Sequence, residues 1–222
     1  MRYVAPRHIV IDDNPTPVPF WQPGPWGDVA AVIVGGGPSH VDVPPAVYRP
    51  YRLVAVNSSA RHVLPVAKPE DILYFSDNSW SERFERLIRD WPGLVVTSNR
   101  NTKARLGHLV NRLNLVELTE WTKCSPDFVQ ASSGHTAACL AAFMGARQIT
   151  LIGVEGGYVN GRSHGHTDYV QHDEHAFRER FLPGWTGLAP VFTRLGVRVF
   201  NATPVTAIRE FPAVRLEEMS HA

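Results

Sequence analysis

The stretch AAVIVGGGPS, residues 30–39, is the clearest indication of the fold in this sequence. Its apolar first half is typical of a buried strand in a parallel sheet, and Gly35, Gly36 and Gly37 follow directly. Glycine allows a sharp turn and a close approach of the backbone to a ligand. Pro38 ends the strand because it has no N–H to donate, and Ser39 adds a hydroxyl where a helix cap or a phosphate contact would lie. The stretch therefore predicts a strand that feeds into a tight strand-to-helix turn or a ligand-binding turn.

Similar apolar runs recur along the chain and alternate with segments of helical character. The predicted strands are Val29–Val34, Arg52–Asn57, Asp71–Phe75, Leu94–Thr97, Leu115–Leu118, Gln148–Ile152 and Val197–Phe200. The predicted helices are Ser81–Asp90, Ser133–Met144 with a stop at Gly145, and His175–Leu195 with a break near Pro183 and Gly184. Strands that alternate with helices predict one α/β, Rossmann-like domain with a mostly parallel, doubly wound sheet and helices on both faces.

The predicted domain occupies residues 29–215, between an N-terminal arm (1–28) and a short C-terminal tail (216–222). The arm carries a short predicted strand, His8–Ile11, and then five prolines between residues 14 and 26, which exclude regular structure there. Its two tryptophans and its phenylalanine favour packing on the domain, on a partner subunit or over the site.

Composition narrows the class of protein. The chain has 222 residues, 44% hydrophobic content and a formal net charge of +1, so charge alone gives no reason to expect nucleic acid or an acidic membrane as partner. Cys124 and Cys139 form no metal or disulfide pattern, which favours reduced thiols in the cytoplasm. No apolar run approaches the ~20 residues of a membrane span, and no signal-peptide core is present at the N-terminus.

Small and polar residues follow most of the predicted strands. In open α/β sheets, ligands bind at the carboxyl ends of the strands, where the strand order reverses. Local turn chemistry explains one or two such ends, whereas six around one sheet edge favour a nucleotide or sugar site. The segments are Gly35–Gly37, Asn57-Ser58-Ser59, Ser76-Asp77-Asn78, Ser98-Asn99, Gly153 to Glu155, and Asn201. Asp77 and Glu155 are candidates for a metal or a ribose, and turn formation is the alternative for each.

The glycine turn lacks the standard cofactor signatures. The third glycine of G-x-G-x-x-G is missing, and Asn57 stands where an acidic residue would end the second strand, so a nicotinamide cofactor is not expected. No Gly-Lys-Ser/Thr follows, which excludes a Walker A loop. The sequence also has no G-x-S-x-G nucleophile elbow.

A second candidate lies at Ser132, Ser133 and Gly134, directly before the alanine-rich predicted helix. Either serine can cap this helix. The helix N-terminus then offers N–H groups and positive potential to an anion. The segment therefore predicts a phosphate contact, with capping alone as the alternative.

The segment GRSHGHTD, residues 161–168, is the most polar part of the chain. His164 or His166 is suited to deprotonate an acceptor hydroxyl near neutral pH. The alternation of His164, His166 and Asp168 also allows a divalent-metal site with Mg, Mn or Zn. A solvated histidine-rich loop is the third interpretation. Arg162 is suited to hold a phosphate or a carboxylate.

Several strings resemble a known family in the same order along the chain: VIVGGGPS (32–39), VAVNSS (54–59), PEDILYFSDNSW (69–80), SGH (133–135), GRSHGH (161–166) and NATP (201–204). Together they resemble a group of small phage and prophage proteins over most of residues 29–215. That group is similar to 6-hydroxymethylpterin diphosphokinase-like proteins and to bacterial lipooligosaccharide sialyltransferases. The likeness to either enzyme rests on the Gly-Pro-Ser turn, Asn57 and the strand order.

The resemblance implies a Rossmann-like fold with a nucleotide donor held by Gly36, Gly37, Pro38, Ser39 and Asn57. In sialyltransferases of this type a histidine is the base and no metal is required, which His164 or His166 would match. In the pterin enzyme, acidic residues hold Mg²⁺ and ATP. Here Asn78 stands after Asp77, where that group tends to keep a second acid, and this departure counts against the diphosphokinase.

The leading prediction is a nucleotide-dependent transferase, glycosyltransferase-like, with a nucleotide-sugar donor and no required cofactor. The phage resemblance implies an acceptor such as modified DNA or a surface glycan, in the cytoplasm of a bacterial host. An ATP- and Mg²⁺-dependent pyrophosphokinase is the first alternative. A non-catalytic virion or assembly protein that uses its N-terminal arm as a partner contact is the second, and a homo-oligomer is compatible with each.

Overall fold

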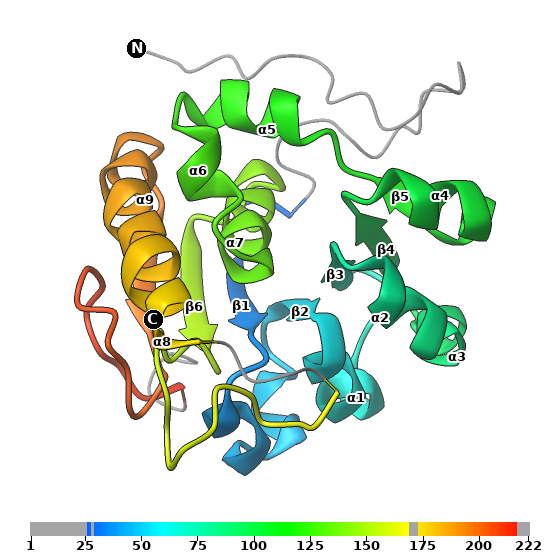
Figure 1. The fold of residues 1–222 in the computed structure, drawn as a ribbon, viewed down its shortest axis with the longest axis horizontal. Helices are drawn as coiled ribbons and strands as arrows, with labels where there is room; N and C mark the ends of the chain where they lie inside the picture. The colour runs from blue at the N-terminus through cyan, green and yellow to red at the C-terminus, as the bar shows by residue number, and fades with distance from the viewer. Residues whose placement is uncertain (1–25, 28, 169–172, 217–222) are drawn as a thin grey trace.

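The computed structural model describes residues 26–27, 29–168 and 173–216. Seven parallel strands form one sheet in the order β5-β4-β3-β2-β1-β6-β7, which confirms the α/β prediction (Figure 1). The strands are β1 (Ala30–Val34), β2 (Arg52–Val56), β3 (Ile72–Phe75), β4 (Leu94–Thr97), β5 (Asn111–Arg112), β6 (Gln148–Ile152) and β7 (Arg198–Asn201). The first strand, β1, lies inside the sheet, with β2 to β5 on one side of it and β6 and β7 on the other. The strand order therefore reverses between β1 and β6.

Side chains alternate between two apolar layers, as the two-residue period of a strand requires. In β1, Ala31 and Ile33 belong to one buried cluster, whereas Val32 and Val34 belong to the other. The first layer packs against α5 (Leu115–Thr122), α6 (Pro126–Val129), α7 (Ser133–Phe143) and α9 (Leu182–Arg194). The second packs against α1 (Ala60–Val63), α2 (Asn78–Arg83), α3 (Glu85–Asp90) and α4 (Arg100–Leu106).

The shorter helical segments fill the connections. They are the 3₁₀ turns Pro38–Asp42, Pro45–Tyr48, Asn57–Ser59, Leu64–Val66 and Gly107–Leu109, the short helix α8 (Glu174–Ala176) and a π-helical turn, Phe177–Phe181. Gly37 precedes the first of these turns, and Pro38 occupies its first position, where a missing N–H costs nothing.

The predicted strand Leu115–Leu118 is wrong, because this segment opens helix α5. Asn114 determines the helix start: its Oδ1 accepts from the N–H of Val116 at 3.1 Å, and its Nδ2 donates to Glu117 at 2.9 Å. A capping residue followed three positions later by glutamate is a helix signal that outweighs the β-branched character of Val116. The strand beside β4 is instead the short segment Asn111–Arg112.

Two predicted helices differ in detail from the structure. Ser81–Asp90 is divided at Phe84, whose φ of −116° separates α2 from α3. The predicted break at Pro183 does not occur, because Pro183 lies in the first turn of α9 and the chain stays helical from α8 through the π-helical turn. The helix predicted at Ser133–Met144 is confirmed as α7, and Gly145 has the positive φ, 104°, expected of a stop.

The described end of the N-terminal arm packs on the domain. Trp26 is buried, its backbone N–H donates to Met144 at 3.0 Å, and its indole N–H donates to the Glu70 carbonyl at 3.2 Å. The predicted strand His8–Ile11 lies outside the described residues. At the other end, Leu216 is buried and its carbonyl accepts from the Tyr51 hydroxyl at 2.9 Å. Among the described residues, no helix has the length and apolar character needed to cross a membrane.

Candidate functional site

The glycine turn after β1 lies against the turn after β6, at the point where the strand order reverses. The N–H of Gly37 donates to the Gly153 carbonyl at 2.9 Å. A Cβ on Gly35 would lie 2.4 Å from that carbonyl oxygen, and one on Gly37 would lie 1.5 Å from Oε2 of Glu155. Both glycines are therefore required by the packing of the two turns. Gly36 differs, since its nearest neighbour would be Nε2 of His166 at 3.4 Å.

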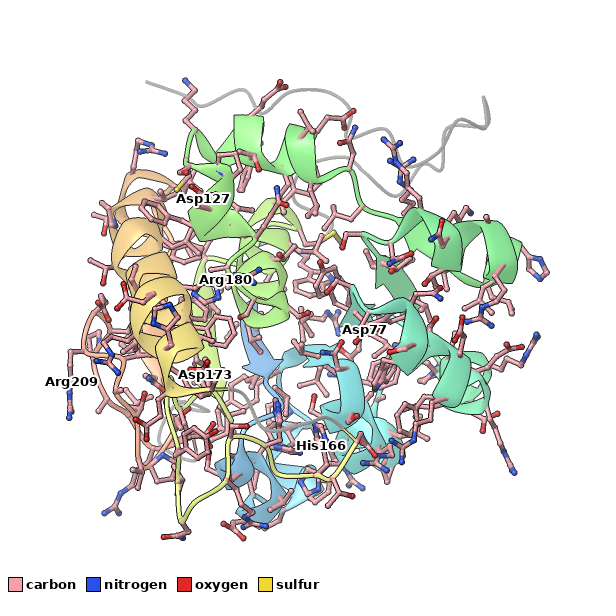
Figure 2. All side chains as sticks on the ribbon, viewed as in Figure 1. Asp77, Asp127, His166, Asp173, Arg180 and Arg209 are labelled. Carbon is pink, nitrogen blue, oxygen red and sulfur yellow. The ribbon has the colours of Figure 1, made fainter. Side chains whose placement is uncertain are left out.

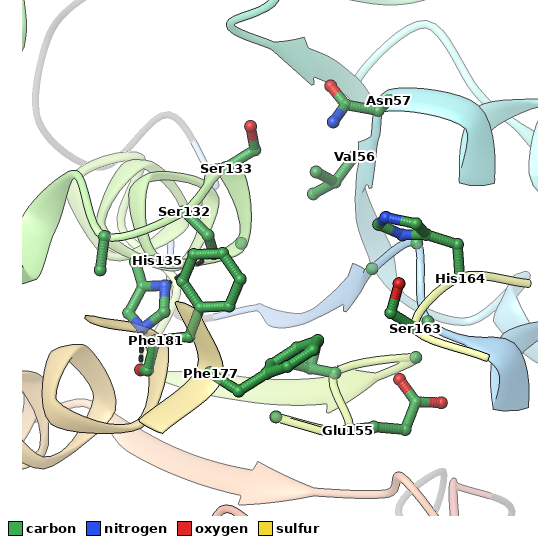
Figure 3. A pocket seen from close by; sticks show the side chains of 18 of the residues that line it. Val56, Asn57, Ser132, Ser133, His135, Glu155, Ser163, His164, Phe177 and Phe181 are labelled. Atoms are coloured by element: carbon green, nitrogen blue, oxygen red, sulfur yellow. Dashed lines mark hydrogen bonds between the residues drawn. The ribbon is translucent and has the colours of Figure 1, made fainter. Parts of the chain in front are cut away.

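A cavity of about 350 Å³ opens over this edge of the sheet. The cavity is formed by four strand ends, the N-terminus of α7, the π-helical turn and residues 161–168, called the histidine segment below (Figure 3). In Figure 2, Asp77, His166 and Arg180 lie around it on different elements. The cavity is lined by Gly35, Gly36, Gly37, Val56, Asn57, Ser76, Asp77, Ala131, Ser132, Ser133, Gly134, His135, Gly153, Val154, Glu155, Gly156, Gly157, Ser163, His164, His166, Phe177, Arg180, Phe181 and Trp185.

Asn57 enters the cavity from the end of β2 in a strained backbone conformation. Its φ is +53°, a left-handed value that asparagine tolerates better than most residues. Its Oδ1 is buried without a hydrogen-bond partner in the described structure, and Figure 3 shows its amide facing the cavity. Backbone strain of this kind concentrates at functional sites, and the binding role of Asn57 stays a prediction.

The first residues of α7 form the facing wall. Ser132 is the N-cap residue, but its hydroxyl makes no capping bond and lies instead 2.7 Å from Nδ1 of His135. The predicted cap by the Ser132 side chain is therefore wrong. The Ser133 hydroxyl lies 3.0 Å from that of Ser76 at the end of β3. The predicted group Ser132, Ser133 and Gly134 does line the cavity, at the positive end of an 11-residue helix.

His135 lies behind Ser132 and is fully buried. Its ring stacks on Trp185 at 4.0 Å between centroids, and Nε2 lies 2.9 Å from the Phe181 carbonyl oxygen. Burial lowers the pKa of His135 to about 3, so the ring is neutral at pH 7. Sequence reasoning missed this residue as part of the site, although a histidine within an alanine-rich buried helix is a visible signal.

The histidine segment lies over the glycine turn. The N–H of Gly165 donates to the Gly36 carbonyl at 2.9 Å, and the rings of His164 and His166 stack with centroids 5.2 Å apart. Nδ1 of His166 accepts from the N–H of Asp168 at 3.2 Å. Burial is the main cause that lowers the pKa of His166, with Asp168 opposing it. Both predicted histidines are thus brought to the cavity.

Asp168 connects the histidine segment to two helices of the second apolar layer. Its side chain is only 4% exposed and forms ion pairs with Arg61 of α1 at 2.5 Å and with Arg83 of α2 at 3.7 Å. In the part of the chain that is described, no group of three or more His, Cys, Asp or Glu residues is arranged to hold a metal ion. The alternative metal site at His164, His166 and Asp168 stays a prediction.

Glu155 lines the cavity, and its carboxylate packs against the glycine turn. Oε1 accepts from the N–H of Ser39 at 2.7 Å, whereas Oε2 is buried without a partner in the described structure. Burial raises the pKa of Glu155, and the hydrogen bond from the Ser39 N–H opposes that rise. Glu155 thus holds the shape of the turn, since the space it occupies is the one a side chain at residue 37 would need.

Other predicted residues take structural positions. Pro38, Ser39, Ser58 and Arg162 are not among the residues that line the cavity. Ser58 is buried and accepts from the Trp80 indole N–H at 2.9 Å, whereas Arg162 is exposed. Asp77 does line the cavity, but its Oδ1 caps α2 by accepting from the N–H of Ser79 at 2.8 Å. A catalytic role for Asp77 stays a prediction.

Sequence reasoning also missed an aromatic wall on the π-helical turn. The rings of Phe177 and Phe181 lie 5.3 Å apart in an edge-to-face arrangement and project toward the cavity (Figure 3). Arg180 lies beside them, with its guanidinium 5.9 Å from the Phe181 ring centre. Single π-helical turns inside α-helices occur frequently at functional sites. No sequence period predicts such a turn, because it departs from the helical repeat by one residue.

The fold is similar to that of a protein of known structure. No family profile matches the chain, and no curated protein sequence matches it. A solved structure of a variant of the sialyltransferase CST-II in complex with CMP is similar, with a TM-score of 0.55 over 83% of this chain and 86% of that one. The two sequences are 15% identical. The fold is sialyltransferase-like.

This likeness confirms the predicted fold class and the sialyltransferase side of the resemblance at the level of fold. The relation to phage proteins and to pterin diphosphokinases stays a prediction, because no comparison bears on it. Acceptor, metal requirement and oligomeric state are likewise expectations from the sequence.

Proposed function

We propose that this protein is a glycosyltransferase-like enzyme that uses a nucleotide-sugar donor. The observation that carries the proposal is the cavity at the strand-order reversal of a sialyltransferase-like fold, where Gly36, Asn57 and the start of α7 converge. Ligands of open α/β sheets bind at this position. The similar sialyltransferase was solved in complex with CMP, which supports a nucleotide as the ligand.

The donor half of the site is formed by the glycine turn, Asn57 and α7. The helix N-terminus at Ser133 and Gly134 is suited to a phosphate, because unpaired N–H groups and the helix dipole favour negative charge there. Gly36 lets the ligand approach the backbone. Phe177 and Phe181 offer an apolar surface against which a ring of the donor or acceptor packs.

The transfer step requires an acceptor hydroxyl to attack the anomeric carbon. The new carbon–oxygen bond forms, the bond from that carbon to the phosphate oxygen breaks, and the nucleotide leaves with the electron pair. We assign the acceptor proton to His164. His166 is less suited, because its Nδ1 lies against Asp168, 3.2 Å from the backbone nitrogen and 3.4 Å from Oδ2. We assign its proton to Nε2, which lies beside Gly36. From there it donates to the departing phosphate.

The acceptor and the metal requirement are carried forward from the sequence. We propose a polymer acceptor, such as modified DNA or a surface glycan. EDTA treatment tests the metal: the leading proposal expects turnover to persist, whereas the alternative pyrophosphokinase reaction would stop.

The proposed activity is tested by incubating the protein with a panel of nucleotide sugars and measuring nucleotide release by chromatography. Release of a nucleoside monophosphate or diphosphate from one donor, at least tenfold above that of the His164→Ala variant, is the expected result. If no donor in the panel is consumed with or without added acceptors, while ATP is converted to AMP in the presence of Mg²⁺, the glycosyltransferase proposal is wrong.

A further inference from the structure

The direction of the hydrogen bond between Ser132 and His135 follows from the contacts of the His135 ring. Nε2 of His135 lies 2.9 Å from the Phe181 carbonyl oxygen, which can only accept, so Nε2 carries a hydrogen. The ring is fully buried against Trp185 and stays neutral at pH 7. A neutral imidazole with hydrogen on Nε2 has a lone pair on Nδ1. The Ser132 hydroxyl, 2.7 Å away, therefore donates to Nδ1.

This bond changes what Ser132 can offer to a ligand. A serine hydroxyl has one hydrogen and two lone pairs, and here the hydrogen is used inside the protein. Ser132 lines the cavity, so a ligand group that reaches its Oγ meets lone pairs alone. Ser133 provides the contrast, because the contact between its hydroxyl and that of Ser76 at 3.0 Å can run in either direction.

We propose that Ser132 Oγ is a specificity-determining acceptor that recognises an N–H or O–H group of the nucleotide, and that it does not bind phosphate. The inference rests on the proposed function and adds the chemistry of one subsite. Phosphate oxygens at neutral pH accept hydrogen bonds, as does this oxygen, so the two repel. The matching donors on a nucleotide are the exocyclic amino group of a base and the hydroxyls of the ribose.

Binding measurements separate these sources. The probes are two pairs in which an amino group is replaced by a carbonyl, CMP with UMP and AMP with IMP, together with the 2′-deoxy and 3′-deoxy forms of CMP and inorganic phosphate. Each is titrated calorimetrically into the full-length protein and into the Ser132→Ala and Ser133→Ala variants. Ser132→Ala removes no capping bond, but it leaves Nδ1 of the buried His135 ring without its donor, so the thermal midpoint is expected to fall and the titrations are made well below it.

The affinity ratio of one pair of probes is expected to fall when Ser132 is replaced. If the donor is an amino group, the unmodified protein binds CMP or AMP at least tenfold more tightly than UMP or IMP, and Ser132→Ala reduces that ratio about threefold to tenfold. If it is a ribose hydroxyl, the ratio of CMP to a deoxy form falls by a similar factor. Ser132→Ala leaves the affinity for inorganic phosphate unchanged, and Ser133→Ala weakens all nucleotides alike.

The tautomer of His135 is measured independently by nitrogen NMR of the ligand-free protein at pH 7. The expected state is a neutral ring with its proton on Nε2. A ring protonated on Nδ1, a phosphate affinity that falls in Ser132→Ala, or discrimination ratios that do not change in this variant would each overturn the inference. Those results leave the proposed function intact, whereas a complete lack of nucleotide binding contradicts the proposed function itself.

Discussion

Asn57 shows how a single residue combines a backbone and a ligand role. Its φ of +53° is tolerated by asparagine and glycine, and its amide faces the cavity. The substitution Asn57→Gly keeps the conformation and removes the amide, whereas Asn57→Ala also adds about 1 kcal/mol of backbone strain. We expect both variants to weaken nucleotide binding about tenfold and only Asn57→Ala to lose stability, as measured by calorimetry and thermal unfolding. Equal affinity in Asn57→Gly and the unmodified protein would remove Asn57 from the site.

The two histidines are expected to differ although their rings stack. His164→Ala should lower kcat about 10²-fold to 10⁴-fold, the range for loss of a general base, with nucleotide affinity unchanged. His166→Ala should weaken nucleotide binding as well, because its Nε2 lies beside Gly36. Steady-state kinetics and calorimetry on the same preparations make this test. The assignment fails if His166→Ala alone abolishes turnover while His164→Ala has no effect.

At the scale of elements, the histidine segment depends on ion pairs that reach across to α1 and α2. Asp168 is almost fully buried between Arg61 and Arg83. Asp168→Asn should therefore loosen residues 163–168, raise their amide exchange about tenfold and lower kcat, while most of the global stability is kept. Asp90→Asn is the matched control, because Asp90 pairs with Arg86 at an exposed position, where such a pair contributes little. Unchanged exchange in Asp168→Asn would show that the loop is held by other contacts.

The elements also show where sequence reasoning succeeds. The apolar runs of β1, β2, β3, β4 and β6 are strongly patterned, and the alanine-rich α7 has a glycine stop, so these could be predicted. The start of α5 is not predicted, because the apolar, β-branched run at Leu115 and Val116 resembles a strand, whereas the Asn114 side chain caps a helix there. The π-helical turn and its aromatic wall follow from tertiary packing and from a break in the helical repeat, for which a single sequence carries no periodic signal.

At the scale of the molecule, buried histidines make stability depend on pH. Burial lowers the pKa of His40 from 6.5 to about 4, and His40 supports the glycine turn by a 2.7 Å hydrogen bond from Nδ1 to the Gly37 carbonyl. The unfolded chain binds this proton below pH 6.5 and the folded chain does not, so the stabilising effect of pH is present above 6.5 and is lost as the pH falls toward 4.

The variant His40→Asn isolates this effect, because an amide can keep the bond to Gly37 without titrating. Between pH 7 and pH 5 the unmodified protein should lose about 2 kcal/mol of unfolding free energy more than the variant. Burial also raises the pKa of Asp71 and Glu155, which acts in the opposite direction but equally in both proteins. Urea unfolding at the two pH values is the measurement, and identical losses would contradict the buried, neutral state of His40.

The architecture as a whole was accessible from sequence, whereas the composition of the site was accessible only in part. Parallel strands place their carboxyl ends at one edge, so Gly36, Asn57 and the histidines could be expected together. Gly35, Gly37 and Glu155 also follow strand ends in the sequence. In the structure they pack the two turns against each other. His135 and Arg180 reach the site from α7 and from the π-helical turn, and their arrival depends on how those helices pack.

We expect a nucleotide to bind over Gly36 at the reversal between β1 and β6. Calorimetric titration of CMP, UMP, AMP, GMP and their sugar derivatives into the unmodified protein tests it, with Gly36→Val as the blocking variant. Ser98→Ala is the control, since Ser98 follows β4 and is not among the residues that line the cavity. We predict one site for at least one nucleotide, with affinity lowered tenfold or more in Gly36→Val and unchanged in Ser98→Ala. No binding of any probe at millimolar concentration, or equal binding by Gly36→Val, would contradict the account.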